Sequence, residues 1–200
     1  MGNTKQQSYS YPVNEIFSGI QGEGFWTGLP VTFIRFAGCN LSCSFCDTDY
    51  SAREYLTSDQ ILERVSCYPV RTLIFTGGEP LIHPLDNLVK ILNKSGFRIH
   101  VETNGTIAIP ENFFNWITVS PKTLNPLVKR CNEVKILVRT GDIPNARGIT
   151  ADHYFISPLN PGLNEKLLIH EDNLKYCIEY ILKNPQWRLS VQLHKYLGIK

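Results

Sequence analysis

The sequence contains no apolar run long enough to cross a bilayer and no long run of lysine or arginine. Charged residues make up only 19% of its 200 residues, and the formal net charge is +2. A basic surface of the kind that holds nucleic-acid phosphates is therefore not indicated. We expect no membrane span and no nucleic-acid partner. The hydrophobic content of 42% suits an ordinary globular chain.

Internal repeats, low-complexity tracts and linker-like stretches are also missing, so residues 1–200 are predicted to form a single domain. Residues 1–12 are polar and are expected to be a poorly ordered N-terminal lead. They lack the apolar core of a signal peptide, and position 6 is Gln where myristoylation requires Ser or Thr. We therefore expect a cytoplasmic protein.

Six cysteines are present, and without an export signal they indicate thiols or metal ligands rather than disulfides. Cys67, Cys131 and Cys177 are scattered singly and are interpreted as core or incidental thiols. The other three lie close together, directly after the strand-like run 31–36.

These three, Cys39, Cys43 and Cys46, are spaced C-x3-C-x2-C. A structural zinc site uses four ligands, and an all-cysteine iron–sulfur cluster also uses four. Three cysteines on a [4Fe–4S] cluster would leave one iron open to a small molecule. The alternatives are a zinc knuckle with a remote fourth ligand, or buried free cysteines.

Apolar periodicity predicts an α/β chain. Strands are predicted at 31–36, 72–76, 97–102, 116–120, 133–138, 153–157 and 187–192. Helices are predicted at 57–67, where Thr57 to Gln60 has the form of a capping box, at 85–95 and at 171–184. Little room remains for helices between the middle strands, so the helical layer is expected to be incomplete.

Polar clusters follow most of the predicted strands. In parallel β/α architectures, ligand sites collect at the carboxyl ends of the strands. The clusters in this position are the cysteine loop and residues 76–80, 102–105, 120–122, 157–158 and 192–195. They predict one functional rim. Upstream, glycines flank Gln21 and Glu23, and we expect a turn there that no strand precedes.

The cysteine spacing, with Phe45 before the last cysteine, resembles the radical S-adenosylmethionine (SAM) enzymes, and residues 76–80 match their Gly-Gly-Glu-Pro element. The whole chain from about residue 11 resembles the 7-carboxy-7-deazaguanine synthase (QueE) family. The matching motifs are Gln21-Gly22-Glu23-Gly24, Phe33-Ile34-Arg35, Cys46-Asp47-Thr48, Glu102-Thr103-Asn104, Ser120-Pro121-Lys122 and Gln192-Leu193-His194-Lys195.

This resemblance implies a modified, incomplete β/α (TIM-like) partial barrel that forms a homodimer. It implies a [4Fe–4S] cluster whose open iron binds SAM, and reductive cleavage of SAM to a 5′-deoxyadenosyl radical. The expected reaction is a Mg²⁺-dependent lyase step. It contracts 6-carboxy-5,6,7,8-tetrahydropterin to 7-carboxy-7-deazaguanine with release of ammonia, on the pathway to the tRNA nucleoside queuosine. SAM would be regenerated, and a flavodoxin- or ferredoxin-type protein would donate electrons.

The resemblance also implies a role for individual residues. The catalytic residues are the three cluster cysteines (Cys39, Cys43 and Cys46) and Thr48, which would bind Mg²⁺. The substrate set is Ile20, Gln21, Gly22, Arg35 and Thr76. The SAM set is Phe45, Cys46, Asp47, Gly78, Glu102, Asn104, Ser120, Pro121, Lys122 and Ser157. Residues 187–200 are expected to form a strand and a tail near the active site.

Two other functions fit parts of this pattern. A glycyl-radical-enzyme activase shares the cysteine spacing and the Gly-Gly-Glu-Pro element, but it would not need Gln21 to Glu23 or Thr48. A zinc-stabilised interaction module would need only the cysteines.

Overall fold

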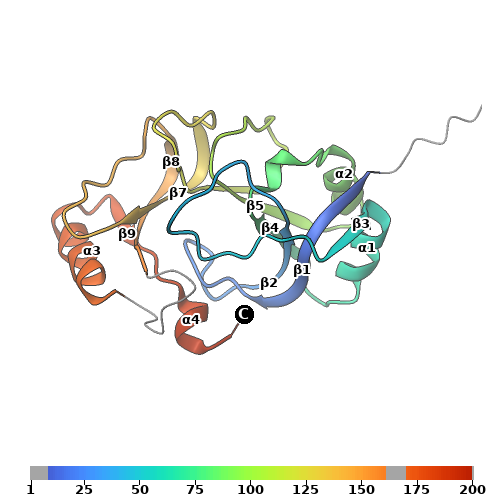
Figure 1. The fold of residues 1–200 in the computed structure, drawn as a ribbon, viewed down its shortest axis with the longest axis horizontal. Coiled ribbons are helices and arrows are strands. Elements are labelled where there is room, and N and C mark those ends of the chain that lie inside the picture. The colour runs from blue at the N-terminus through green and yellow to red at the C-terminus, as the bar shows by residue number, and fades with distance from the viewer. Residues whose placement is uncertain (1–8, 161–169, 200) are drawn as a thin grey trace, which may run out of the picture.

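The structure, a computed structural model, describes residues 9–160 and 170–199. Expectations about residues 1–8 and Lys200 lie outside this range. The described residues form one nine-stranded sheet of order β3-β1-β2-β4-β5-β6-β7-β8-β9 (Figure 1). Its strands are β1 (Ser10–Ile20), β2 (Pro30–Phe36), β3 (Glu54–Thr57), β4 (Thr72–Gly77), β5 (Arg98–Thr103), β6 (Trp116–Val119), β7 (Arg130–Val138), β8 (Thr150–Pro158) and β9 (Trp187–Leu189).

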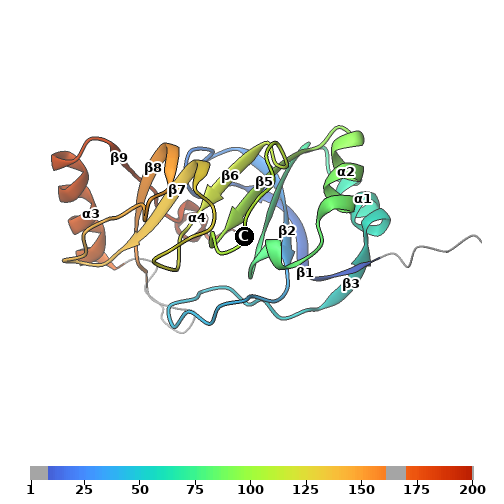
Figure 2. The ribbon, with the colours of Figure 1, turned by 90° about the horizontal axis from the view of Figure 1, so that it is seen from above.

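Neighbouring strands from β2 to β9 are parallel, whereas β1 runs antiparallel to both β2 and β3. The sheet curves but does not close, because β3 and β9 are its two edges (Figure 2). This confirms the predicted α/β fold of partial-barrel type. It also confirms that the loops after the parallel strands emerge at a common rim.

The expectation of an unstructured lead up to residue 12 was wrong for residues 10–12, and so was the expectation that no strand precedes the glycine-rich turn. These residues begin β1, and Tyr11 is only 1% exposed. Pro12 is tolerated in this strand because it lies outside the ladder with β2, which starts one residue later at Val13, so that ladder does not need its missing N–H. On the other side, Pro12 lies opposite Tyr55 of β3.

The helical layer is thin, as expected. Helices α1 (Ser58–Ser66) and α2 (Asp86–Lys94) lie side by side at one end of the sheet, and α3 (Glu171–Lys183) covers the other end (Figures 1 and 2). A short 3₁₀ turn, η1 (Pro80–Ile82), follows β4. The predicted capping box is confirmed, since Gln60 N–H donates to Thr57 Oγ1 at 3.3 Å and Thr57 N–H donates to Gln60 Oε1 at 2.8 Å.

The C-terminal segment differs from the predicted strand at 187–192. β9 ends at Leu189, and residues 193–197 form helix α4 (Leu193–Leu197), which ends at Gly198 in the left-handed conformation with φ of 62°. The turn into α4 brings Gln192, His194 and Lys195 to a cavity at the rim of the sheet.

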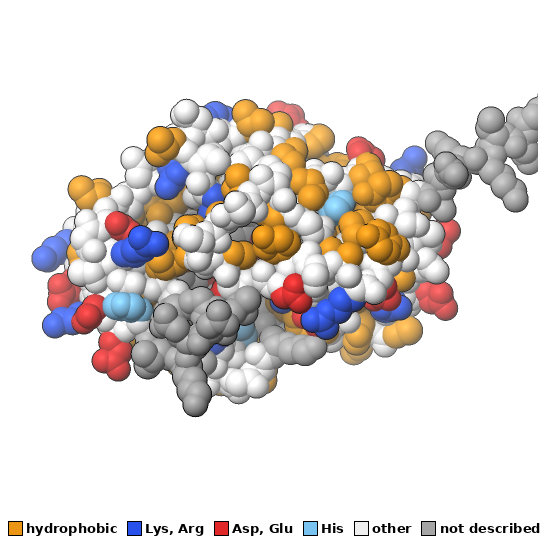
Figure 3. Space-filling model, viewed as in Figure 1, with side chains coloured by type: hydrophobic (Ala, Val, Ile, Leu, Met, Phe, Trp, Pro, Cys, Tyr) orange, Lys and Arg blue, Asp and Glu red, His pale blue; other side chains and the backbone are white. Residues whose placement is uncertain are grey.

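Two hydrophobic clusters hold the sheet to its helices, one around Phe36, Phe75 and Leu88 and one around Val134, Ile156 and Cys177. On the face drawn in Figure 3, the described charged side chains are scattered and do not gather into a patch of one sign. Among the described residues, the helices are too short and too polar to cross a membrane.

Candidate active site

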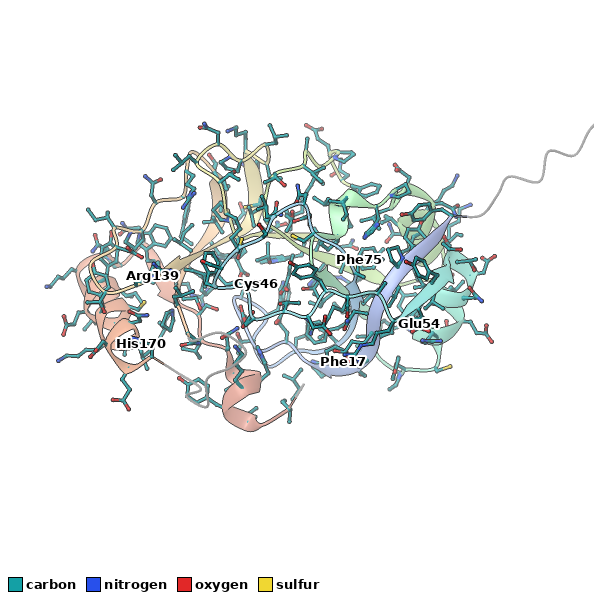
Figure 4. The ribbon with its side chains drawn as sticks, in the orientation of Figure 1. Phe17, Cys46, Glu54, Phe75, Arg139 and His170 are labelled. Carbon is teal, nitrogen blue, oxygen red and sulfur yellow. The ribbon has the colours of Figure 1, made fainter. Side chains whose placement is uncertain are left out.

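The rim of the parallel strands carries a cavity of about 220 Å³. Figure 4 places Cys46 near the middle of the molecule, on the long loop that follows β2. All three cluster cysteines and Thr48 line the cavity. It is also lined by members of the SAM set, namely Phe45, Asp47, Gly78, Glu102, Asn104, Ser120 and Lys122. The structure therefore gathers residues from segments far apart in the sequence, from Glu23 to Gln192.

The cluster cysteines have the chemistry that an iron–sulfur cluster requires. All six cysteines are free thiols, and Cys46 is exposed. The N–H of Leu41 donates to Cys39 Sγ at 3.4 Å, a contact of the kind that tunes cluster potential. Burial raises the pKa of the Cys39 thiol, and the nearby Glu79, Cys43 and Cys46 raise that pKa by a smaller amount. Ligation would therefore have to release a firmly held proton.

The described residues include no group of three or more Cys, His, Asp or Glu side chains close enough to hold a single metal ion. The three cluster cysteines are therefore not gathered around one point, as the ligands of a zinc ion are. In a four-iron cluster each thiolate binds a different iron, so the sulfurs lie farther apart than they do around one ion.

The Gly77-Gly78 turn lets the end of β4 pack against the cysteine loop. Gly77 has φ of +123°, and a Cβ on Gly78 would lie 1.9 Å from the Gly38 carbonyl oxygen. Gly78 N–H donates to the Phe36 carbonyl at 3.2 Å, and Glu79 N–H donates to the Gly38 carbonyl at 3.0 Å. No side chain larger than hydrogen fits here, so the diglycine fixes the position of the loop that carries Cys39.

Glu79 fastens this turn to the end of β5. Its fully buried carboxylate accepts from Asn104 N–H at 2.7 Å and from Thr103 Oγ1 at 2.8 Å. Burial raises the pKa of Glu79 despite these hydrogen bonds. The Asn104 side chain in turn donates to Asn40 Oδ1 at 2.9 Å. Both residues therefore hold the cysteine loop in place, a role the sequence did not indicate for Asn104.

Two members of the SAM set do not line the cavity. Ser157 is only 2% exposed and Pro121 is buried, and the cavity wall next to Ser157 is made instead by residues 158–160. Lys122 does line it, with Nζ 5.3 Å from the centre of the Phe45 ring. Burial lowers the pKa of Lys122, and the nearby Lys135 lowers it further.

A second cavity of about 190 Å³ adjoins the first and is lined by the whole substrate set, Ile20, Gln21, Gly22, Arg35 and Thr76. The Arg35 guanidinium lies 3.4 Å from the Glu15 carboxylate and packs over the Phe17 ring at 5.9 Å. Glu15 therefore orients Arg35, and this pairing was not predicted from the sequence.

The two cavities share the wall formed by Glu23, Asp47, Thr48, Thr76, Glu102 and Gln192. Glu102 accepts from Gln21 Nε2 at 3.1 Å and from Thr76 Oγ1 at 2.9 Å. It was expected as a SAM contact, but both of its partners belong to the substrate set. Thr48, the predicted Mg²⁺ ligand, lies at this same junction, with the cluster cysteines on one side and Arg35 on the other.

A buried ion pair at the junction was missed at the sequence level. Lys135 of β7 is 8% exposed, and its ammonium group bonds the Glu23 carboxylate. Burial acts to lower the pKa of Lys135, but Glu23, Glu102 and Glu133 outweigh it and raise that pKa above its usual range. The signal for this pair was available, because Lys135 is a single cation within the apolar run 134–138.

The C-terminal segment closes the junction from the other side. Lys195 Nζ donates to Asp47 Oδ2 at 2.6 Å, and Gln192 Nε2 donates to the same oxygen at 3.1 Å. Burial acts to raise the pKa of Asp47, but the bond to Lys195 outweighs it and holds that pKa below its usual range. The backbone of Leu193 also donates to the Gly22 carbonyl at 2.9 Å. Helix α4 is thus tied both to the cysteine loop and to the turn after β1.

Comparisons with known proteins agree with this geometry. The radical SAM superfamily model matches residues 33–166. A 7-carboxy-7-deazaguanine synthase of Bacteroides thetaiotaomicron is 41% identical over 94% of this chain and 98% of its own length. One of Bradyrhizobium diazoefficiens is 37% identical over 96% of this chain and 100% of its own length. The crystal structure of QueE from Escherichia coli has a TM-score of 0.72 at 29% identity, covering 92% of this chain and 95% of that one.

The superfamily match spans the strands and loops that carry all three cluster cysteines, and the relatives are matched over nearly their entire length. The two adjoining cavities and the motifs around them therefore have a common explanation: the chain belongs to the 7-carboxy-7-deazaguanine synthase family of the radical SAM superfamily.

Proposed function

We propose that this protein contracts 6-carboxy-5,6,7,8-tetrahydropterin to 7-carboxy-7-deazaguanine and releases ammonia, as a radical SAM lyase of deazapurine biosynthesis. The observation that carries the proposal is the pair of cavities. One is lined by the cluster cysteines and by all of the SAM set except Pro121 and Ser157, the other is lined by the substrate set, and they meet at a shared wall. Relatives that bear the synthase name match along nearly the whole chain.

In the first cavity, Cys39, Cys43 and Cys46 would hold the [4Fe–4S] cluster and leave one iron for SAM. When bound and reduced, the cluster supplies the electron that cleaves SAM to a 5′-deoxyadenosyl radical. The N–H groups of Gly78 and Glu79 already donate within the protein, so this turn offers carbonyl oxygens to a ligand. Carbonyls accept from an ammonium group, which is the group that the amino end of SAM presents.

In the second cavity, the Arg35 guanidinium offers a planar pair of donors that fits a carboxylate. Glu102 offers acceptors to N–H groups of a pterin ring, and its orientation is fixed by Gln21 and Thr76. Thr48 lies between the cavities, where its hydroxyl could bind a Mg²⁺ ion that also contacts the substrate carboxylate. Asp47 next to it is already bonded to Lys195 and Gln192, so Thr48 is the better candidate.

We further propose a homodimer that works in the cytoplasm and receives electrons from a flavodoxin- or ferredoxin-type protein. Family resemblance supports these three assignments. Light scattering on the purified protein measures the dimer directly.

The defining experiment is an anaerobic assay of reconstituted protein with SAM, reductant and 6-carboxytetrahydropterin, with and without Mg²⁺. We expect a Mg²⁺-dependent deazapurine product, with SAM not consumed in proportion. SAM cleavage without a deazapurine would favour the activase instead, an alternative that the family membership does not support. An iron-free, zinc-loaded protein would favour the interaction module.

Replacing Arg35 should weaken pterin binding. We expect Arg35→Ala to raise KM for the pterin roughly tenfold to a hundredfold, because one charge-assisted bidentate contact is lost. KM for SAM should stay within about twofold of the parental value, since Arg35 lines the substrate cavity and not the cavity with the cluster cysteines. Steady-state kinetics measures both values. Arg53→Ala is the matched control, because Arg53 is exposed and lines neither cavity; an unchanged pterin KM in Arg35→Ala would refute the assignment.

Replacing Thr48 should affect Mg²⁺ and leave iron in place. We expect Thr48→Ala to raise the Mg²⁺ concentration for half-maximal activity about tenfold or more, because a direct ligand is lost. Thr48→Ser keeps the hydroxyl and should behave like the parent. Iron content, measured alongside the Mg²⁺ titration, separates the two roles: loss of iron in Thr48→Ala would make Thr48 a structural residue of the cysteine loop.

A further inference from the structure

A third, small cavity lies behind the substrate cavity, inside the curve of the sheet. It has a volume of about 10 Å³ and is enclosed by β4 to β7 and by the turn that follows β1. Gln21, Glu23 and Glu102 line it as well as the substrate cavity, so they form the partition between the two. No role for this cavity follows from the cluster, from SAM or from the pterin.

Unpartnered polar atoms concentrate around this cavity. In the described part of the chain, five buried side-chain N or O atoms have no hydrogen-bond partner. Three of them, Trp26 Nε1, His100 Nδ1 and Trp116 Nε1, belong to residues that line it. Buried polar groups in proteins are nearly always bonded, and each one left without a partner costs about 1–3 kcal/mol. Three such groups around one cavity point to a bound ligand.

The donor and acceptor types select the ligand. An indole N–H can only donate, so a ligand next to Trp26 and Trp116 must accept hydrogen bonds. Ammonium has no lone pair and cannot accept. The carboxylates of Glu102 and Glu133 line the same cavity, and their oxygens can accept further hydrogen bonds besides those they already receive. Water both accepts and donates, and a cavity of about 10 Å³ is close to the smallest that holds one water molecule.

The surrounding residues are held rigidly. His100 is 3% exposed, and burial lowers its pKa to about 4, so its ring is neutral. Trp116 stacks on His153 with ring centres 5.8 Å apart, and Phe25 N–H donates to Glu133 Oε2 at 3.0 Å. These contacts restrain the Trp116 ring and the Glu133 carboxylate beside the cavity.

We propose that this cavity binds one ordered water molecule, which links the indole N–H groups of Trp26 and Trp116 to the Glu102 carboxylate. The water approaches Glu102 from the side opposite the substrate cavity. Gln21 and Thr76 already donate hydrogen bonds to the same carboxylate. Trp116 is thus a positioning residue that acts through the water on Glu102. The positioning role of Trp116 rests on the proposed function, whereas the water site does not.

Crystal structures of the holoenzyme and of Trp116→Phe, at a resolution that shows ordered water, test the site. Phenylalanine keeps an aromatic ring for stacking but removes the donor. We expect density for one water within hydrogen-bond distance of Trp26 Nε1, Trp116 Nε1 and the Glu102 carboxylate in the parent, and a lost or displaced water in the variant. A dry cavity in the parent, or side chains rearranged to fill it, would overturn the proposal.

Kinetics test the positioning step. We expect Trp116→Phe to raise KM for the pterin about threefold to tenfold, the effect of one hydrogen bond, with KM for SAM unchanged. Trp187→Phe is the matched control, because Trp187 is buried on β9 away from the cavity. A bound water with an unchanged pterin KM in Trp116→Phe would remove the positioning role. Absence of any deazapurine product from the parent would instead count against the proposed function and leave the density result standing.

Discussion

Cys43→Ala should lose the cluster and all turnover together. Cys43 lies in the loop between Cys39 and Cys46, and all three line the same cavity. A [4Fe–4S] cluster of this type needs three cysteine ligands, so the two thiolates left in the variant should not retain it. We expect iron content and the charge-transfer absorbance of the cluster to fall to background after anaerobic reconstitution, and SAM cleavage with them.

Cys67→Ala is the matched control for this loss. Cys67 is exposed at the end of α1, outside the cavity, so this variant should keep parental iron and activity. Equal losses in both variants would mean that reconstitution depends on general thiol content. Full iron and turnover in Cys43→Ala would remove Cys43 from the ligand set.

Lys135→Met should destabilise the protein by about 3–5 kcal/mol, the usual result of removing one partner of a buried ion pair. Lys135 faces Glu23, Glu102 and Glu133, and without its charge these carboxylates would lie close together with little solvent. The turn after β1, which Glu23 anchors, should loosen first. Urea unfolding of the variant and the parent measures the difference in the free energy of unfolding.

Two further variants give this prediction its controls. Lys90→Met makes the same substitution on the exposed face of α2 and should change stability by less than about 0.5 kcal/mol. The double variant Glu23→Gln, Lys135→Met removes both charges of the pair and should recover part of the loss. If Lys135→Met were as stable as Lys90→Met, the pair would have no structural role, and its place between the cavities would have to be explained by catalysis alone.

Some site residues could be predicted from the sequence and others could not, and the difference lies in how far apart in the sequence the interacting residues are. Cys39, Cys43 and Cys46 share one loop, so their convergence follows from spacing alone. Part of the lining also follows from sequence, because the polar clusters at 76–80, 102–105 and 120–122 come at the ends of parallel strands. By contrast, Lys135 meets Glu23 across 112 positions and Lys195 meets Asp47 across 148. No local pattern predicts which buried cation meets which carboxylate over such separations.

The secondary structure was likewise predicted where local sequence decides it and missed where long-range contacts decide it. The parallel strands contain short apolar stretches, such as Leu73-Ile74-Phe75 in β4, which local composition reveals. Strand β1 was missed because Pro12 and Gly19 interrupt its pattern, and it is stabilised by pairing on both sides with β2 and β3. Helix α4 was missed because five residues are too few to show helical periodicity, and its position depends on bonds to Gly22 and Asp47.

The sequence by itself determined the fold class, the family and many of the residues that line the two cavities, including Cys39, Cys43 and Cys46. These depend on short motifs and on the period of apolar residues, both of which are local properties of the chain. Only the tertiary structure decided that Glu79 and Asn104 fasten the cysteine loop, that Glu102 turns toward the substrate side and that α4 ties Asp47 to Lys195. It also revealed the small polar cavity behind Glu102. Such features depend on how curved strands and loops pack in three dimensions, and that packing is set by long-range contacts rather than by any single segment.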